Sequence, residues 1–246
     1  MKIAVMGASG TMGSLVSGLL EHQGADVVRA QRSTGVDAVT GDGLAAALSG
    51  ADVVVDCLNS NTQSGRKAKA FFGTAAGNIG RIVAGTDARL VCLSICQATD
   101  PAVNRTMGYY QGKAAQEATY RTLLGDRATM VRTTQWFELA ETLVGRMSVG
   151  PLAVMPHMVT APLAAADGAA VIADTALGRL HRGASAVEVR GPERMDLVDV
   201  GRALRRQAGR PGPIAVDFGG LALRDGRLIP EHADVVTATT LQEWLA

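Results

Sequence analysis

The chain has 246 residues and a formal net charge of +1; 47% of its residues are hydrophobic and only 4% are aromatic. This length suits one large α/β domain or a domain with a smaller appendage. The near-zero charge gives no general attraction to nucleic acid or to an anionic membrane, so we expect neither as a partner. Since the first apolar run ends at Gly7 and no uncharged apolar span approaches about 18 residues, we also expect no signal peptide and no membrane helix.

Strand-like and helix-like segments alternate along the chain with short connections, which is typical of parallel strands joined by right-handed crossovers. The expected strands are residues 3–6, 26–29, 36–39, 51–58, 90–95, 128–133 and 186–190. The expected helices are residues 11–22, 44–48, 67–79, 108–124, 136–145, 165–177, 197–207 and 241–246. The sequence therefore predicts an α/β fold, a Rossmann-type doubly wound parallel sheet with a small C-terminal substrate-binding lobe.

The texture of the sequence changes near residue 150, where Pro151, Pro156 and Pro162 interrupt a short irregular segment. The last hundred residues are too few and too interleaved to form an independent core. We therefore expect residues 1–150 to form the cofactor-binding core. Residues 151–246 are then an interleaved lobe over the carboxyl ends of the strands, where ligands bind in open α/β folds.

A glycine-rich turn joins the first expected strand to the first expected helix. Gly7 would permit the tight turn, Gly10 would let the backbone approach a pyrophosphate, and Gly13 would let the helix pack close to the strand. The free N–H groups at the helix start would face the phosphates. The residues expected to contact a dinucleotide here are Gly7, Ser9, Gly10, Thr11, Met12 and Gly13.

The end of the second strand indicates which dinucleotide is bound. An NAD-binding fold usually places a carboxylate there for the ribose hydroxyls, whereas this chain has Arg32, Ser33 and Thr34. An arginine beside two hydroxyls favours a clamp for a 2′-phosphate, hence NADP(H), over a solvated loop arginine. Asp42 would contact the adenine edge or cap the helix that follows it. Asn59 would contact the nicotinamide half or satisfy a turn.

The predicted chemistry lies in and beside the helix expected at residues 108–124. Tyr109 and Lys113 are four residues apart, so they share one face of the helix. Lys113 could bind the nicotinamide ribose, and its charge would lower the pKa of Tyr109. The phenol would then protonate a carbonyl oxygen while NADPH delivers hydride. Ser94, at the end of its strand, would orient that carbonyl.

Taken together, these motifs resemble the short-chain dehydrogenase/reductase superfamily, in its atypical NmrA-like NAD(P)H-binding branch. The segments that carry the resemblance are residues 7–13, 32–37, 54–56, 93–94, 108–110, Lys113, 116–117, 132–137, Asp167, 191–193 and 244–245. The resemblance implies an NADP(H)-binding Rossmann fold with a small substrate lobe. Similar proteins include reductases of quinones and small carbonyls, and also redox sensors that bind the dinucleotide without turning it over. Two departures from the pattern are Gly112 inside the helix and the loop at residues 96–100.

Several further residues have two interpretations. Gln135, Trp136 and Phe137 would line the substrate pocket or pack against the lobe, with Trp136 the better wall. His157 would orient substrate or relay a proton, or else be a surface histidine. The four histidines show no metal spacing, so no metal is expected.

We therefore expect an NADPH-dependent oxidoreductase that reduces a small or medium hydrophobic carbonyl or quinone. The alternatives are a non-catalytic NADP(H)-sensing regulator and a cofactor-retaining isomerase or epimerase. Cys57, Cys92 and Cys96 have no framework spacing and predict buried free thiols in a reducing compartment, by default the cytoplasm. The sequence leaves monomer and homodimer open.

Overall fold

The computed structural model describes residues 1–105, 107–149, 152–180, 183–217 and 220–246, and its centre is a seven-stranded sheet. In spatial order the strands run β12-β9-β5-β4-β3-β1-β2, and every neighbouring pair is parallel. Their bounds are β1 Lys2–Met6, β2 Asp26–Ala30, β3 Val53–Asp56, β4 Arg89–Ile95, β5 Ala128–Thr133, β9 Ala186–Arg190 and β12 Val235–Val236. The predicted Rossmann-type parallel sheet is confirmed.

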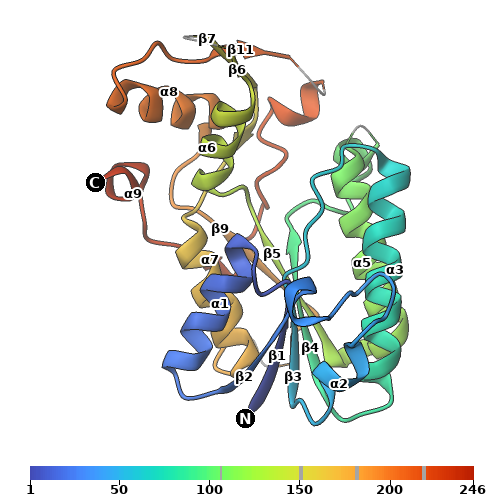
Figure 1. The fold of residues 1–246 in the computed structure, drawn as a ribbon. Coiled ribbons are helices and arrows are strands. Elements are labelled where there is room, and N and C mark those ends of the chain that lie inside the picture. Colours follow the sequence, from blue (N-terminus) through green and yellow to red (C-terminus); the bar gives the residue numbers. More distant parts are fainter. Residues whose placement is uncertain (106, 150–151, 181–182, 218–219) are drawn as a thin grey trace.

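Helices cover both faces of this sheet (Figure 1). On one face lie α1 (Thr11–His22) and α7 (Ala165–Ala176), and on the other lie α2 (Leu44–Leu48), α3 (Gly65–Ala84) and α5 (Gly108–Leu124). Each interface is filled by a large buried apolar cluster, in which β1, β3 and β4 send alternate residues to opposite faces. This three-layer packing explains why the strand sequences are almost continuously apolar.

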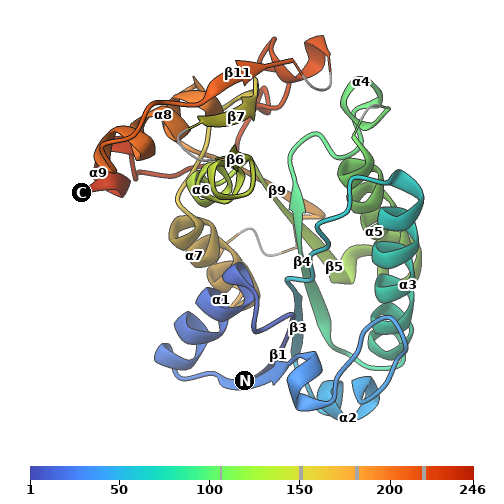
Figure 2. The same cartoon turned by 45° about the horizontal axis from the view of Figure 1, so that its top comes forward.

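The remaining elements gather beyond the carboxyl ends of the strands (Figure 2). Their helices are α4 Pro101–Asn104, α6 Phe137–Arg146, α8 Leu197–Gln207 and α9 Leu241–Leu245, and their strands are β6 Ser148–Val149, β7 Leu152–Pro156, β8 Val159–Thr160, β10 Met195–Asp196 and β11 Ile214–Val216. Short 3-10 turns occupy Arg32–Thr34, Gly125–Arg127 and Leu221–Leu223. A third apolar cluster joins this part to α5 through Tyr110 and Phe137.

The structure corrects the expected strand at residues 36–39, which forms a turn. Asp37 causes this, because its carboxylate accepts hydrogen bonds from the N–H groups of Val39 at 2.7 Å and Thr40 at 3.2 Å. Val36 and Ala38 are still buried, so the apolar alternation reflected burial and not strand pairing.

The predicted boundary between residues 150 and 151 lies outside the described residues. Beyond it, β9 and β12 complete the central sheet and α7 covers one of its faces. The segment predicted to be irregular instead contains β7 and β8. No helix within the described residues is long and apolar enough to cross a membrane.

Candidate active site

The glycine turn follows β1, the strand at which the strand order of the sheet reverses. From β1 the chain goes to β2 on one side and then returns to β3 on the other, so the carboxyl ends of β1 and β3 form the topological switch point. Gly7 has a φ of +72°, and a Cβ added to it would lie 3.1 Å from the carbonyl oxygen of Cys57, just after β3. Glycine is therefore required at Gly7 by conformation and by the closeness of the neighbouring chain.

Gly13 is required by packing and Gly10 leaves space for a ligand. A Cβ on Gly13 would lie 2.2 Å from the carbonyl oxygen of Gly7, whereas a Cβ on Gly10 would meet only that same oxygen, at 3.3 Å. No side chain caps the start of α1, and its first turn carries no acidic residue. Ser9, Gly10 and Thr11 are exposed, while Met12 is buried and offers only its backbone. These residues fit a pyrophosphate on the helix N-terminus.

Of the residues after β2, some form hydrogen bonds within the turn, whereas the Arg32 guanidinium is left open to solvent. The Thr34 hydroxyl donates to the carbonyl of Gln31 at 2.8 Å, and the Ser33 hydroxyl accepts from the Gln31 amide at 2.7 Å. The Arg32 side chain is exposed, and its guanidinium has no hydrogen-bond or ion-pair partner among the described residues. Of the predicted clamp, the Arg32 guanidinium and the Ser33 hydroxyl proton are thus free to bind a phosphate. The hydroxyl of Thr34 already serves the turn.

Asp42 and Asn59 also have local partners. Asp42 accepts the Thr40 hydroxyl at 2.6 Å and does not cap α2, whose N-cap residue Gly43 makes no side-chain bond. The capping alternative for Asp42 is therefore wrong, and its adenine contact stays a prediction. The Asn59 side chain accepts the N–H of Ser60 at 2.8 Å, which is its expected turn role.

Tyr109 and Lys113 share one face of α5, as their spacing predicts. Both contact Phe72 of α3: the Tyr109 ring lies 5.7 Å from the Phe72 ring, edge to face, and the Lys113 ammonium lies 4.5 Å from the same ring. Tyr109 is half-buried, and its hydroxyl has no hydrogen-bond partner among the described residues. The neighbouring Tyr110 is buried and accepts from Gln135 at 2.7 Å, and burial raises the pKa of its phenol well above the ordinary value. Of these two phenols, only Tyr109 is free to exchange a proton with a ligand.

Lys113 lies deeper than its predicted role requires. It is 1% exposed, and its ammonium donates to the carbonyls of Leu58 at 3.3 Å and Leu93 at 2.9 Å and to the Gln116 side chain at 3.0 Å. All three ammonium protons therefore have acceptors, two near the carboxyl ends of β3 and β4 and one on α5 itself. A ribose hydroxyl would have to replace one of these acceptors.

Ser94 differs from its prediction. The residue is 3% exposed, and its hydroxyl donates to Glu117 at 2.6 Å, so its one proton is not available to a substrate carbonyl. Glu117 also accepts two hydrogen bonds from Arg132, at 2.9 and 2.6 Å, and Arg132 in turn reaches Glu188 at 2.8 Å. Burial lowers the pKa of Arg132, but its bonds to Glu117 and Glu188 more than offset this and raise it above its ordinary value.

Two of the predicted pocket residues are interior. Gln135 is 4% exposed and bridges Tyr110 to the Thr160 hydroxyl, and Phe137 is fully buried, 5.2 Å from the Trp244 ring. Both therefore have the packing role that the sequence left as the alternative. Trp136 stays half-buried at the start of α6 and donates to Thr133 at 3.0 Å.

His157 has a carboxylate partner. Its Nδ1 lies 2.5 Å from Asp196, the residue that caps α8. Burial raises the pKa of Asp196, but hydrogen bonds from His157 and from two backbone N–H groups lower it below its ordinary value. The described residues contain no group of three or more side chains placed to hold a metal ion. Cys57, Cys92 and Cys96 are buried free thiols, as predicted.

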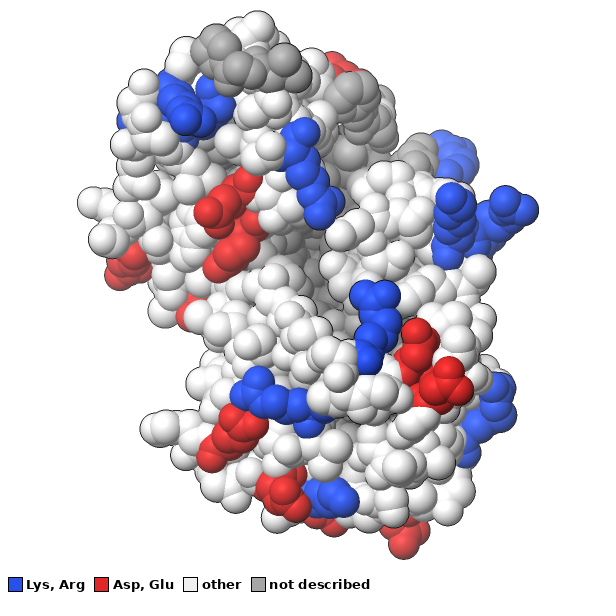
Figure 3. Space-filling model, viewed as in Figure 1, with Lys and Arg blue, Asp and Glu red and all other residues white. Residues whose placement is uncertain are grey.

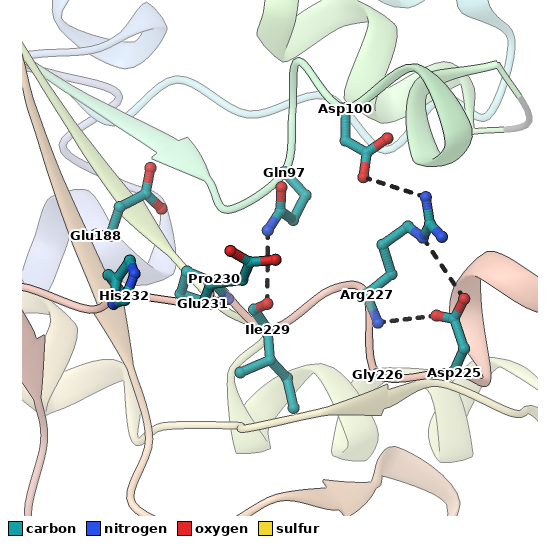
Figure 4. A pocket seen from close by; sticks show the side chains of 10 residues that line it. All are labelled: Gln97, Asp100, Glu188, Asp225, Gly226, Arg227, Ile229, Pro230, Glu231 and His232. Carbon is teal, nitrogen blue, oxygen red and sulfur yellow. Dashed lines mark hydrogen bonds and ion pairs between the residues drawn. The ribbon is translucent and has the colours of Figure 1, made fainter.

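The molecular surface around the site carries charges of both signs (Figure 3). This face is hollowed between the part that holds α6 and α8 and the part that holds α3 and α5. A separate cavity of about 720 Å³ opens beside the end of β4 (Figure 4). Its lining residues are Gln97, Asp100, Glu188, Asp225, Gly226, Arg227, Ile229, Pro230, Glu231 and His232. No residue predicted for the site lines it.

Comparison with solved structures identifies proteins of the same fold. A hypothetical dTDP-4-dehydrorhamnose reductase from Sulfolobus tokodaii has a TM-score of 0.70 at 17% identity, with 99% of each chain covered. A dTDP-4-dehydrorhamnose reductase from Bacillus anthracis, in complex with NADP, has a TM-score of 0.68 at 14% identity, over 88% of this chain and 84% of that one. A short-chain dehydrogenase/reductase superfamily protein from Agrobacterium tumefaciens, with bound NAD, has a TM-score of 0.65 at 14% identity, over 100% and 95%.

No family model and no curated protein matches the sequence. The likeness to the solved structures shows that this chain has the fold of short-chain dehydrogenase/reductase proteins. Since one of these structures holds NADP and another NAD, the likeness does not decide between the two dinucleotides. The NmrA-like branch stays a prediction from the sequence.

Proposed function

We propose that the protein is an NADP(H)-dependent oxidoreductase that reduces a small or medium hydrophobic carbonyl or quinone. The observation that carries the proposal is the turn between β1 and α1. It joins an uncapped helix N-terminus to an open Gly10, at the switch point of a parallel sheet. Such a site attracts a pyrophosphate through free N–H groups and the positive end of the helix dipole.

Arg32 supports NADP(H) over NAD. It follows β2, where a ribose-binding carboxylate would favour NAD, and no described acidic group neutralises it. A guanidinium can form two parallel hydrogen bonds to phosphate oxygens, which suits a 2′-phosphate. Ser33 lies beside it and is exposed.

Tyr109 is the residue that we assign to proton transfer. Bound NADPH would supply a hydride to the carbonyl carbon, and the Tyr109 hydroxyl would donate a proton to the carbonyl oxygen, so that the carbonyl group becomes an alcohol. Lys113 would bind the ribose if a ribose hydroxyl replaced one of its three present hydrogen-bond acceptors. Ser94 is left outside this chemistry because its proton already serves Glu117. Tyr109 packs, as Ile95 and Met107 do, against a buried apolar cluster, and these surroundings favour a hydrophobic substrate.

The test is consumption of NADPH across a panel of carbonyls and quinones, with wild type, Tyr109→Phe and the matched control Tyr110→Phe. We expect Tyr109→Phe to lower carbonyl turnover by about 10²–10⁴-fold, as loss of a general acid does. Tyr110→Phe removes a buried phenol of the same type from the next position, so turnover should stay within a few-fold. Equal turnover by Tyr109→Phe and wild type would show that Tyr109 is not the acid.

Two other results would replace the proposal. Tight NADPH binding without consumption of any panel member would favour a dinucleotide sensor. Conversion of a substrate at constant NADPH absorbance would favour an isomerase or epimerase that retains its cofactor.

A further inference from the structure

A buried polar network lies between α5 and the carboxyl ends of β3 and β4, and Asp56 is at its centre. Asp56 is the last residue of β3 and is completely buried. One carboxylate oxygen accepts the N–H of Leu58 at 2.9 Å. The other accepts the Gln116 amide at 2.7 Å and the Tyr120 hydroxyl at 2.6 Å. The carboxylate thus has three donors, none of which is a cation.

The same carboxylate fixes two of the three acceptors of Lys113. Because the Gln116 nitrogen donates to Asp56, its amide oxygen must face the other way, where it accepts from Lys113 at 3.0 Å. Because the N–H of Leu58 bonds to Asp56, the turn that presents the Leu58 carbonyl to Lys113 is held in place. The third acceptor, the Leu93 carbonyl, belongs to β4.

Charge balance also pairs Asp56 with Lys113. A buried ion is strongly unfavourable unless an opposite charge lies near it. The other buried carboxylate near Lys113 is that of Glu117 on α5, and it is already paired with Arg132 and Arg121, at 2.6 and 3.1 Å. The buried ammonium of Lys113 therefore has Asp56 as its counter-charge, with Gln116 as the bridge.

We propose that Asp56 is a positioning residue for Lys113, acting through Gln116 and through the turn at Leu58. It holds the ammonium at the carboxyl ends of β3 and β4, beside the switch point where the dinucleotide would bind. This inference rests on the proposed NADP(H) site and on the role of Lys113 within it. It assigns a function to a carboxylate that lies too deep to touch any ligand itself.

The test is a double-mutant cycle on the Kd of NADPH, measured from the fluorescence of the bound cofactor. Asp56→Asn leaves one side-chain oxygen for three donors, so the hydrogen bond from the Gln116 amide or the one from the Leu58 N–H is lost. We expect the Kd to rise about tenfold, within the range of coupling between residues of one hydrogen-bond network. Lys113→Met should raise the Kd as well. If Asp56 acts through Lys113, adding Asp56→Asn to Lys113→Met should change the Kd no further.

Two more variants keep the result interpretable. Tyr120→Phe removes another donor to Asp56, but the Tyr120 hydroxyl is not one of the acceptors of Lys113, so the Kd of this variant should stay within about twofold of wild type. Gln116→Met breaks the bridge without changing any charge and should reproduce the tenfold rise if Asp56→Asn does not fold. Thermal unfolding without cofactor confirms that each variant is folded.

The outcomes separate the two proposals. If wild type does not bind NADPH, the proposed function fails and the positioning role fails with it. If wild type binds NADPH and the effects of Asp56→Asn and Lys113→Met are additive, only the positioning role is overturned. The same holds if Gln116→Met binds NADPH as tightly as wild type.

Discussion

Gly112 gives a sharp test of how α3 and α5 pack beneath the proposed site. It lies in the middle of α5, where glycine costs about 1 kcal/mol of helix stability relative to alanine. From the sequence alone this glycine looks like a defect. In the structure, a Cβ at Gly112 would lie 2.6 Å from the Phe72 ring and 2.8 Å from the Cβ of Ala68, both on α3. The glycine therefore lets the two helices approach each other.

The expected effect of Gly112→Ala is the difference between two opposing contributions. Overpacking of a filled interface costs about 1–3 kcal/mol, and the gain in helix propensity returns about 1 kcal/mol. We expect a net loss of about 1 kcal/mol in the free energy of unfolding, which lowers Tm by about 2–4 °C in a protein of this size.

Gly73→Ala is the matched control, since it makes the same change in the interior of α3. A Cβ there meets no atom within 4 Å, so only the propensity gain remains, and Tm should rise by a similar amount. We therefore expect calorimetry to show Tm shifts of opposite sign for the two variants. A rise in Tm for Gly112→Ala would refute the packing argument.

Two further predictions concern the glycine turn and the start of α8. Gly13→Ala places a Cβ 2.2 Å from the Gly7 carbonyl oxygen, so the turn must move, and titration with NADPH should show at least a tenfold weaker complex; unchanged affinity would contradict the assigned turn. Asp196→Ala removes the cap of α8 and the partner of His157, and should cost about 1–2 kcal/mol at neutral pH. Because the pKa of Asp196 is lowered in the folded protein, its contribution is present above the unfolded value of about 3.9 and is lost as the pH falls through the folded value. Urea unfolding of both proteins should therefore show a difference that shrinks below about pH 4, and a difference that grows there would contradict it.

The sequence predicts those parts of the fold that depend on local patterns. The bounds of α1, α2, α5, α8, β5 and β9 match their predictions, since each combines a clear apolar period with a glycine or polar boundary. The segment at 36–39 has an apolar alternation too, but the Asp37 carboxylate accepts hydrogen bonds from the N–H groups that follow it, and these bonds turn the backbone. The short strands β7 and β11 pair over about sixty residues of chain, and no local pattern encodes such a pairing.

The candidate site divides in the same way. The glycine turn and the shared face of Tyr109 and Lys113 follow from spacing alone. The partners of Ser94 and Lys113 do not, because Glu117 meets Ser94, and the carbonyls of Leu58 and Leu93 meet Lys113, only after the sheet and α5 are packed together. The signal that was available is the charged residue within an apolar strand, as at Asp56. A charge in such a position predicts a buried partner, although not which one.

We propose that this chain binds a phosphorylated nicotinamide dinucleotide through the glycine turn and Arg32. The most direct test of this proposal is the Kd of NADPH against that of NADH, for wild type and for Arg32→Ala. We expect wild type to prefer NADPH by at least about tenfold. Arg32→Ala should lose most of this preference while its affinity for NADH stays nearly the same, because NADH lacks the 2′-phosphate. Equal affinities of wild type for the two cofactors, or a preference for NADPH that survives in Arg32→Ala, would contradict it.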